Sequence, residues 1–267
     1  MKQKIYQVDA FTDRVFGGNP AAVCPLDKWL SDALLQKIAM ENNLAETAFY
    51  VRDNNHYQIR WFTPTIEVDL CGHATLATAY VLFHLEGHTG DRIHFHSPKS
   101  GTLSVTRAGD WLTLDFPADP VEEVPMTEAL IRGLSIRPIL AFKGRTDYLL
   151  VYDSEDDVKN VIPGFDPISK LDARGLIITA PGTAVDFVSR FFAPQSGVDE
   201  DPVTGSAHTT LIPYWSQRLD KNTLTASQLS KRGGYLKCEN RGDRVAISGQ
   251  ARLYMIGQIN LNTDSTL

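Results

Sequence analysis

Two stretches of the 267-residue chain combine residues that can move protons with glycine-containing helix starts. One reads Phe-Thr-Pro-Thr-Ile-Glu-Val-Asp-Leu-Cys-Gly-His-Ala-Thr over residues 62–75, and the other reads Phe-Ala-Pro-Gln-Ser-Gly-Val-Asp-Glu-Asp-Pro-Val-Thr-Gly-Ser-Ala-His over residues 192–208. Carboxylates and imidazoles act as general acids and bases when their surroundings bring their pKa toward neutrality. The proton-handling candidates are Glu46, His73, Asp201 and Ser206.

The two stretches follow one pattern, which indicates an internal duplication. In each copy, Pro comes two residues after the first Phe and Val-Asp comes six and seven residues after it. A start of small residues follows, Cys71-Gly72-His73-Ala74 in one copy and Thr204-Gly205-Ser206-Ala207 in the other. The alignment of the two halves extends further toward the N-terminus without a gap, which places Ala45 and Gly175 each 17 residues before the Phe of their copy.

This register has a chemical consequence for Glu46, which falls where the second copy has the apolar Leu176. A carboxylate at a buried position needs polar partners or holds a raised pKa. The helix starts at Gly72 and Gly205 offer free backbone N–H groups and a positive dipole end, which suit a carboxylate or phosphate. We expect both starts to face one cleft.

Periodicity predicts the elements that position these residues. The stretch 72–83 is apolar or small on every side, which is typical of a buried helix, and a second helix is expected over 30–38. A tight, exposed turn is expected at 17–20. Strands are expected at 4–11, 44–51, 57–62, 91–96, 101–107, 111–116, 147–152, 175–180 and 185–192, and a helical stretch at 166–171.

A proline-rich stretch over 117–125 reads as a linker, so we expect two domains. Their predicted bounds are 1–118 and 119–267, with the last strand free to return to the first domain. Each half then reads as an α+β unit of antiparallel strands wrapped around one buried helix.

Composition excludes several classes of protein. Hydrophobic content of 43% and charged content of 22% are those of an ordinary globular chain without a membrane span. The N-terminus lacks the apolar core of a signal peptide, so a cytoplasmic location is expected.

A net charge of −6 without a basic aromatic stretch argues against nucleic acid or anionic membranes as partners. Cys24, Cys71 and Cys238 are too scattered for a disulfide framework or a zinc cluster, and no metal or cofactor is expected.

As a set, the motifs resemble the PhzF family of phenazine-biosynthesis proteins over nearly the whole chain. Besides the two stretches above, the resemblance rests on Gly-Asn-Pro-Ala-Ala-Val over 18–23 and Ala-Glu-Thr-Ala-Phe over 45–49. It implies the diaminopimelate epimerase-like fold, an active site between two pseudo-symmetric domains, and commonly a homodimer. It also implies cofactor-independent proton relocation on a small carboxylate-bearing substrate.

The resemblance further implies roles for individual residues. Glu46 would take a proton from carbon and return it elsewhere, while His73, Asp201 and Ser206 would bind the substrate and assist the transfer. The expected substrate-binding positions are Asn19, Gly72, Gly205, Ser206 and Ala207.

Two alternatives stay open from the residues alone. An epimerase or racemase of a small amino or hydroxy acid would use Glu46 with Cys71 or His73. The resemblance also implies a relation to epimerases and proline racemases, which use two cysteines. Here Cys71 stands in the first place but Thr204 in the second, and because a hydroxyl is too weak an acid, racemisation by two thiols is disfavoured. A non-catalytic metabolite-binding protein is the other alternative. The family's late glutamine–glycine element is matched only loosely over 228–234, so the natural substrate is not identified.

Overall fold

The computed structural model describes residues 2–261, and its chain divides into two compact units. The first unit contains residues 2–114 together with 249–261, and the second contains residues 115–248. The C-terminal segment belongs to the first unit because β17 (Ala251–Asn260) pairs antiparallel with β1 (Lys2–Ala10). Within the described part of the chain, no helix is both long and apolar enough to cross a membrane.

The strands of the first unit follow the spatial order β17, β1, β2, β3, β4, β6, β7, β8. The pairs β2–β3 and β4–β6 are parallel, the other neighbours are antiparallel, and β5 adds a short antiparallel pairing to β4. The bounds are β2 Asn19–Leu26, β3 Glu46–Asp53, β4 His56–Phe62, β5 Glu67–Val68, β6 Arg92–Ser97, β7 Gly101–Ala108 and β8 Trp111–Pro117.

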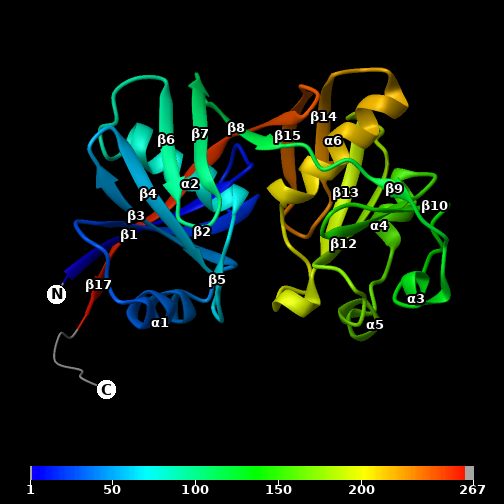
Figure 1. Ribbon diagram of the computed structural model, residues 1–267, viewed down its shortest axis with the longest axis horizontal. Coiled ribbons are helices and arrows are strands. Elements are labelled where there is room, and N and C mark those ends of the chain that lie inside the picture. Colours follow the sequence, from blue (N-terminus) through cyan, green and yellow to red (C-terminus); the bar gives the residue numbers. More distant parts are fainter. Residues whose placement is uncertain (1, 262–267) are drawn as a thin grey trace. The chain divides into compact units, whose positions relative to one another are not determined.

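Helix α2 (Gly72–His84) is the buried helix that the sequence predicted, since every residue in it except Tyr80 and His84 is buried. Figure 1 shows α2 among the strands of its unit, with α1 (Asp32–Asn42) at the periphery. Helix α1 begins after Ser31 and ends before the left-handed Asn43, so it starts and ends later than the predicted range 30–38. Its buried residues pack with Phe49 of β3 in one apolar cluster.

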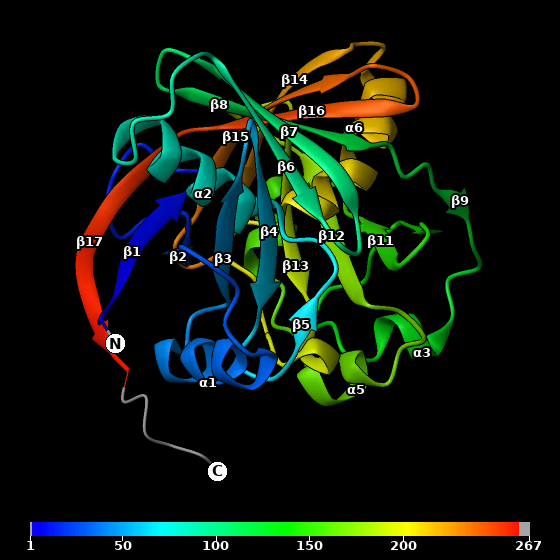
Figure 2. The same ribbon diagram turned by 60° about the vertical axis from the view of Figure 1, so that its left-hand side comes forward.

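The second unit repeats the arrangement of the first. Its strands run β9 to β16 in spatial order, and the alternation of antiparallel and parallel pairs from β10 to β15 matches that from β1 to β7, leaving out the short β5. Helix α6 (Gly205–Leu219) takes the place in the chain order that α2 has in the first unit, as Figure 2 lets the reader follow. This equivalence supports the duplication inferred from the motifs.

The remaining bounds of the second unit are β9 Glu122–Glu123, α3 Glu128–Ile131, β10 Leu140–Lys143, β11 Asp147–Val151, α4 Glu155–Asn160, α5 Phe165–Ser169, β12 Gly175–Pro181, β13 Phe187–Phe192, the 3-10 turn Pro194–Ser196, β14 Thr223–Gln228, β15 Gly234–Asn240 and β16 Arg244–Gly249. Apolar residues of α4 and α5 pack with β12 and β13 in the core of this unit.

The prediction of an exposed turn at 17–20 is wrong for most of its length. Exposure is confined to residues 13–16, whereas Gly17 and Gly18 are buried and Asn19 begins strand β2. Gly18 has a φ of +59°, and a Cβ there would overlap the backbone oxygen of Ala10. The glycine therefore lets the chain fold back closely on β1 and carry Asn19 into the interior.

The predicted correspondence between Glu46 and Leu176 is wrong by one residue. Thr47 pairs with Phe62, whereas Leu176 pairs with Phe192, so Leu176 corresponds to Thr47. Glu46 therefore corresponds to Gly175. A Cβ on Gly175 would overlap the ring of Phe191, so in the second unit an aromatic ring occupies the space where a side chain would emerge.

Gly175→Ala should therefore destabilise the protein by about 1–3 kcal/mol, since a methyl group forced against a packed ring requires a backbone or rotamer shift. The measurement is the urea midpoint of unfolding. Gly257→Ala is the matched strand control, because its Cβ would lie 3.4 Å from Ile5 Cγ2, an ordinary contact. Equal midpoints for the two variants would contradict the packing at Gly175.

Candidate active site

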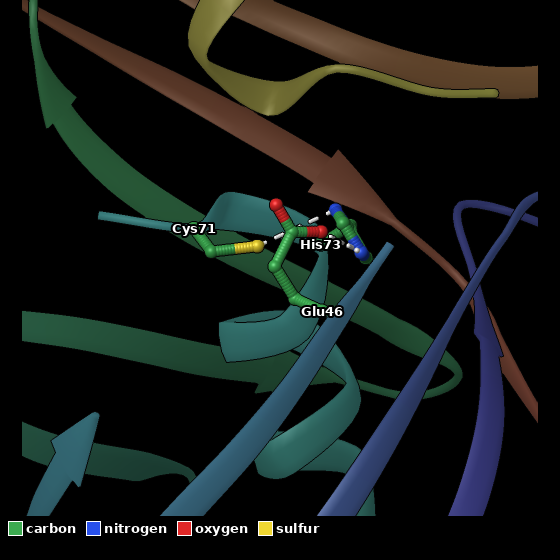
Figure 3. Close-up of side chains that lie close together, drawn as sticks. All are labelled: Glu46, Cys71 and His73. Atoms are coloured by element: carbon green, nitrogen blue, oxygen red, sulfur yellow. Dashed lines mark hydrogen bonds and ion pairs between the residues drawn. The ribbon is translucent and has the colours of Figure 1, made fainter. Parts of the chain in front are cut away.

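The first cluster of functional side chains lies at the start of α2, where strand β3 begins beside it. Glu46 is the first residue of β3, and His73 lies in the first turn of α2. The Glu46 Oε2 and His73 Nε2 atoms are 3.2 Å apart, and their side chains are 16% and 4% exposed. Figure 3 shows the two side chains converging with that of Cys71, the residue before the helix.

The other ring nitrogen of His73 fixes where the ring proton lies. Asn19 Nδ2 is 3.2 Å from His73 Nδ1, and Cys71 Sγ is 3.5 Å from the same nitrogen. An amide NH₂ group can only donate, so Nδ1 accepts and the proton of the neutral ring is on Nε2, which faces Glu46. Burial lowers the pKa of His73 to about 3, which keeps the ring neutral at physiological pH.

The second cluster lies at the start of α6 and is held by a buried glutamine. Thr204 Oγ1 donates to Asp201 Oδ2 at 2.5 Å. Gln228, at the end of β14, accepts from the Thr204 backbone N–H at 2.8 Å and donates to the Asp201 backbone oxygen at 2.7 Å. Because the Gln228 side chain is fully buried, these bonds fix the turn between Asp201 and the helix.

Ser206 in the same unit lies beside a guanidinium group. Arg174 Nη1 donates to Ser206 Oγ at 2.8 Å, and two further N–H groups of Arg174 bind both carboxylate oxygens of the buried Asp147. An arginine only donates, so the Ser206 oxygen accepts here and its own proton can go to another acceptor. Cation, hydroxyl and helix start together suit an anion.

The two helix starts are held by equivalent side-chain bonds. Thr75 Oγ1 donates to the Cys71 backbone oxygen at 2.6 Å, and His208 Nδ1 donates to the Thr204 backbone oxygen at 2.8 Å. Both bonds join the fourth residue of the helix to the residue before the helix. Burial lowers the pKa of His208 to about 4, although its bond to Thr204 opposes the shift.

A family profile described as phenazine biosynthesis-like protein, PhzC-PhzF, matches residues 8–257 of the chain. The protein belongs to the PhzF family. Two relatives from Pseudomonas aeruginosa, both named uncharacterized isomerase, are 53% and 52% identical to this PhzF-family chain; each match covers 98% of this chain and 100% of the relative. The human phenazine biosynthesis-like domain-containing protein is 41% identical, over 97% of this chain and 99% of its own.

Solved structures agree with this assignment. A PhzF-family protein of Enterococcus faecalis is 48% identical and superposes with a TM-score of 0.95, covering 98% of this chain and 100% of its own. A hydroxyproline epimerase of Agrobacterium vitis, only 8% identical, shares the fold with a TM-score of 0.64 over 98% of this chain and 94% of its own. The predicted diaminopimelate epimerase-like fold of this PhzF protein is thus confirmed.

The structure brings the predicted site residues together in two groups, one in each unit. Glu46, His73 and Asn19 meet beside Gly72 in the first unit. Asp201 lies at the turn before α6, and Gly205, Ser206 and Ala207 form its first turn. That these two groups of residues face one cleft stays a prediction.

Sequence reasoning missed the residues that hold the second group. The motifs include neither Arg174 nor Asp147, and Gln228 belongs only to the loose match over 228–234. Their partners lie 32 residues away for Arg174–Ser206 and 24 for Gln228–Thr204, so no local spacing marks them. Asp147 and Arg174 stand at or next to the starts of the predicted strands 147–152 and 175–180, and charged groups there need bonding partners once buried. No predicted strand marks Gln228.

Gln228→Leu should lower the free energy of unfolding by about 2–4 kcal/mol, because the Thr204 N–H and the Asp201 oxygen each lose a buried partner. Urea unfolding at neutral pH measures the loss. Ser227→Ala, the preceding residue of the same strand, should change stability far less, since Ser227 makes one weak bond at 3.3 Å. A Gln228→Leu protein as stable as the Ser227→Ala control would show that the buried amide does not hold the turn.

Stability should fall as the pH drops below about 6.5, because His73 and His208 resist protonation in the folded state and accept protons once unfolded. Each of them lowers the free energy of unfolding by up to about 1.4 kcal/mol per pH unit, His208 down to about pH 4 and His73 to about pH 3. Above pH 6.5 both contributions are constant.

The check is urea unfolding at pH 7 and pH 5 for the parent, His73→Gln, His208→Gln and the exposed control His94→Gln. Each of the first two variants should flatten the pH dependence, and the control should keep it. A parent slope that neither buried-histidine variant reduces would contradict the assignment.

Proposed function

We propose that this PhzF-family protein is a cofactor-independent isomerase that relocates a proton on a small carboxylate-bearing metabolite. The observation that carries the proposal is the Glu46 carboxylate set 3.2 Å from Nε2 of a neutral, buried His73. Relatives named isomerases, 53% and 52% identical, support the reaction class.

In this mechanism, Glu46 is the base that takes a proton from carbon and the acid that returns it. With a pKa of about 3, His73 does not take up that proton at neutral pH. Its Nε2 instead faces the carboxylate at 3.2 Å, which keeps the Glu46 side chain beside the helix start. The burial that keeps His73 neutral therefore leaves Glu46 as the single base of the pair.

The second unit supplies the anion-binding part of the proposal. The Ser206 hydroxyl oxygen accepts a hydrogen bond from Arg174, so the hydroxyl can donate its own hydrogen bond to a substrate carboxylate. The N–H groups of Gly205, Ser206 and Ala207 in the first turn of α6 add donors and a positive dipole end. Asp201, whose carboxylate accepts from Thr204, is assigned to substrate binding and to assisting the transfer.

A second candidate is an epimerase, favoured by the Cys71 thiol 3.5 Å from His73 Nδ1. Inversion of a carbon centre needs a proton donor and an acceptor on opposite faces. The position equivalent to Cys71 is Thr204, whose hydroxyl donates to Asp201. The epimerase would therefore depend on Cys71, whereas the proposed isomerase would not.

Deuterium incorporation distinguishes the candidates. The purified protein in deuterated buffer, given a panel of cyclic unsaturated carboxylates and amino acids, should label a C–H position of at least one compound. Glu46→Gln should reduce the rate by about 10²–10⁴-fold, the usual contribution of a general acid/base. Cys71→Ala should keep the rate within a few-fold.

Other outcomes would point elsewhere. Loss of exchange in Cys71→Ala together with inversion of a stereocentre would support the epimerase. Saturable binding of a panel carboxylate without exchange for any compound would support a metabolite-binding protein. Unchanged exchange in Glu46→Gln would refute the assigned base.

A further inference from the structure

The cluster at the start of α2 holds one reactive group that the proposed isomerase does not use, the thiol of Cys71. Cys71 is 6% exposed, and its sulfur lies 3.5 Å from the acceptor nitrogen of His73. One ligand atom each from Glu46, Cys71 and His73 lies within 4.8 Å of the others. Thiolate, imidazole and carboxylate are the side chains that bind Zn²⁺ in proteins.

The distance between sulfur and nitrogen fits one ion between them. Zn–S and Zn–N bonds of about 2.3 Å and about 2.05 Å, applied to the 3.5 Å separation of Cys71 Sγ and His73 Nδ1, give an S–Zn–N angle of about 107°. That angle is close to tetrahedral. The Asn19 amide must turn its nitrogen away from Nδ1 for the ion to bind there.

Glu46 takes the place that a carboxylate usually has behind a metal-binding histidine. It lies 3.2 Å from Nε2, the nitrogen that stays protonated when Nδ1 binds an ion. Such a carboxylate fixes the orientation of the ring and increases its basicity. Two protein ligands leave coordination positions that water or a small carboxylate can fill.

We infer that Cys71 Sγ and His73 Nδ1 bind a thiophilic divalent cation of the Zn²⁺ class, with Glu46 orienting the histidine. On binding, a metal–sulfur bond replaces the S–H bond and the thiol proton leaves to solvent. The ion adds positive charge beside Glu46, so metal binding should inhibit the proton transfer proposed above. That inhibition rests on the proposed function, whereas the binding itself does not.

The test is titration of the full-length, reduced protein with Co²⁺, which reports thiolate ligation by an absorption band from sulfur-to-cobalt charge transfer. The band should appear, saturate with a single site per chain, and disappear when Zn²⁺ is added. Cys71→Ser should remove it. Cys238→Ser is the matched control, since Cys238 is buried and belongs to no metal-ligand group among the described residues, and it should keep the band.

The variants of the other two residues test the arrangement. His73→Gln should weaken Co²⁺ binding at least as much as Glu46→Gln, for which about 10–100-fold is expected of a residue behind a ligand. Circular dichroism and urea midpoints confirm that each variant is folded.

No charge-transfer band at millimolar Co²⁺, or a band that survives Cys71→Ser, would overturn the inference. Because these titrations contain no substrate, their failure is separable from failure of deuterium exchange. Cobalt binding without effect on an exchange reaction would retain the site and reject the inhibition.

Discussion

The exclusion of water from the start of α2 is the constraint on which the first cluster depends. A helix buried on nearly every side has no exposed face, so polar groups in its first turn must find partners inside the protein. The ring of His73 lies 3.2 Å from Asn19 on one side and 3.2 Å from Glu46 on the other, and these residues come from the parallel strands β2 and β3. The same burial keeps the imidazole neutral, and a neutral ring between a donor and a carboxylate has only one arrangement of its proton.

Parallel pairing is what brings those partners together. Glu46 pairs with Ala21, so Asn19 lies two residues earlier along β2 and near the same end of the strand pair. A parallel pair requires a crossover, and helix α1 makes it between β2 and β3. Asn19 and Glu46, 27 positions apart in the sequence, thereby both reach the imidazole of His73. The close turn at Gly18 allows Asn19 to begin its strand inside the protein.

The features that the sequence predicted are those that repeat or have a period. The all-round apolar pattern of 72–83 was sufficient for α2, and the duplicated motif was sufficient for the equivalence of α2 and α6. Strand β2 was missed because Gly-Gly-Asn-Pro reads locally as a turn, and only its pairing with β1 and β3 makes the end of this stretch a strand. The one-residue error at Glu46 has a related cause. The spacing of 17 residues includes the turn between the two strands of the hairpin. The corresponding residues of the two units are instead defined by which residues pair across the hairpin.

The corrected register changes how the divergence of the two halves is understood. His73 and Ser206 occupy the same position in their helices, and each is in contact with a charged residue at the start of the equivalent strand: Glu46 in one unit, Arg174 in the other. The charge has the opposite sign and comes from the neighbouring residue, because Phe191 fills the space at Gly175. A carboxylate beside an N–H donor suits proton transfer, whereas a guanidinium beside a hydroxyl suits an anion. A duplicated fold can therefore hold a carboxylate at one helix start and a guanidinium at the equivalent one.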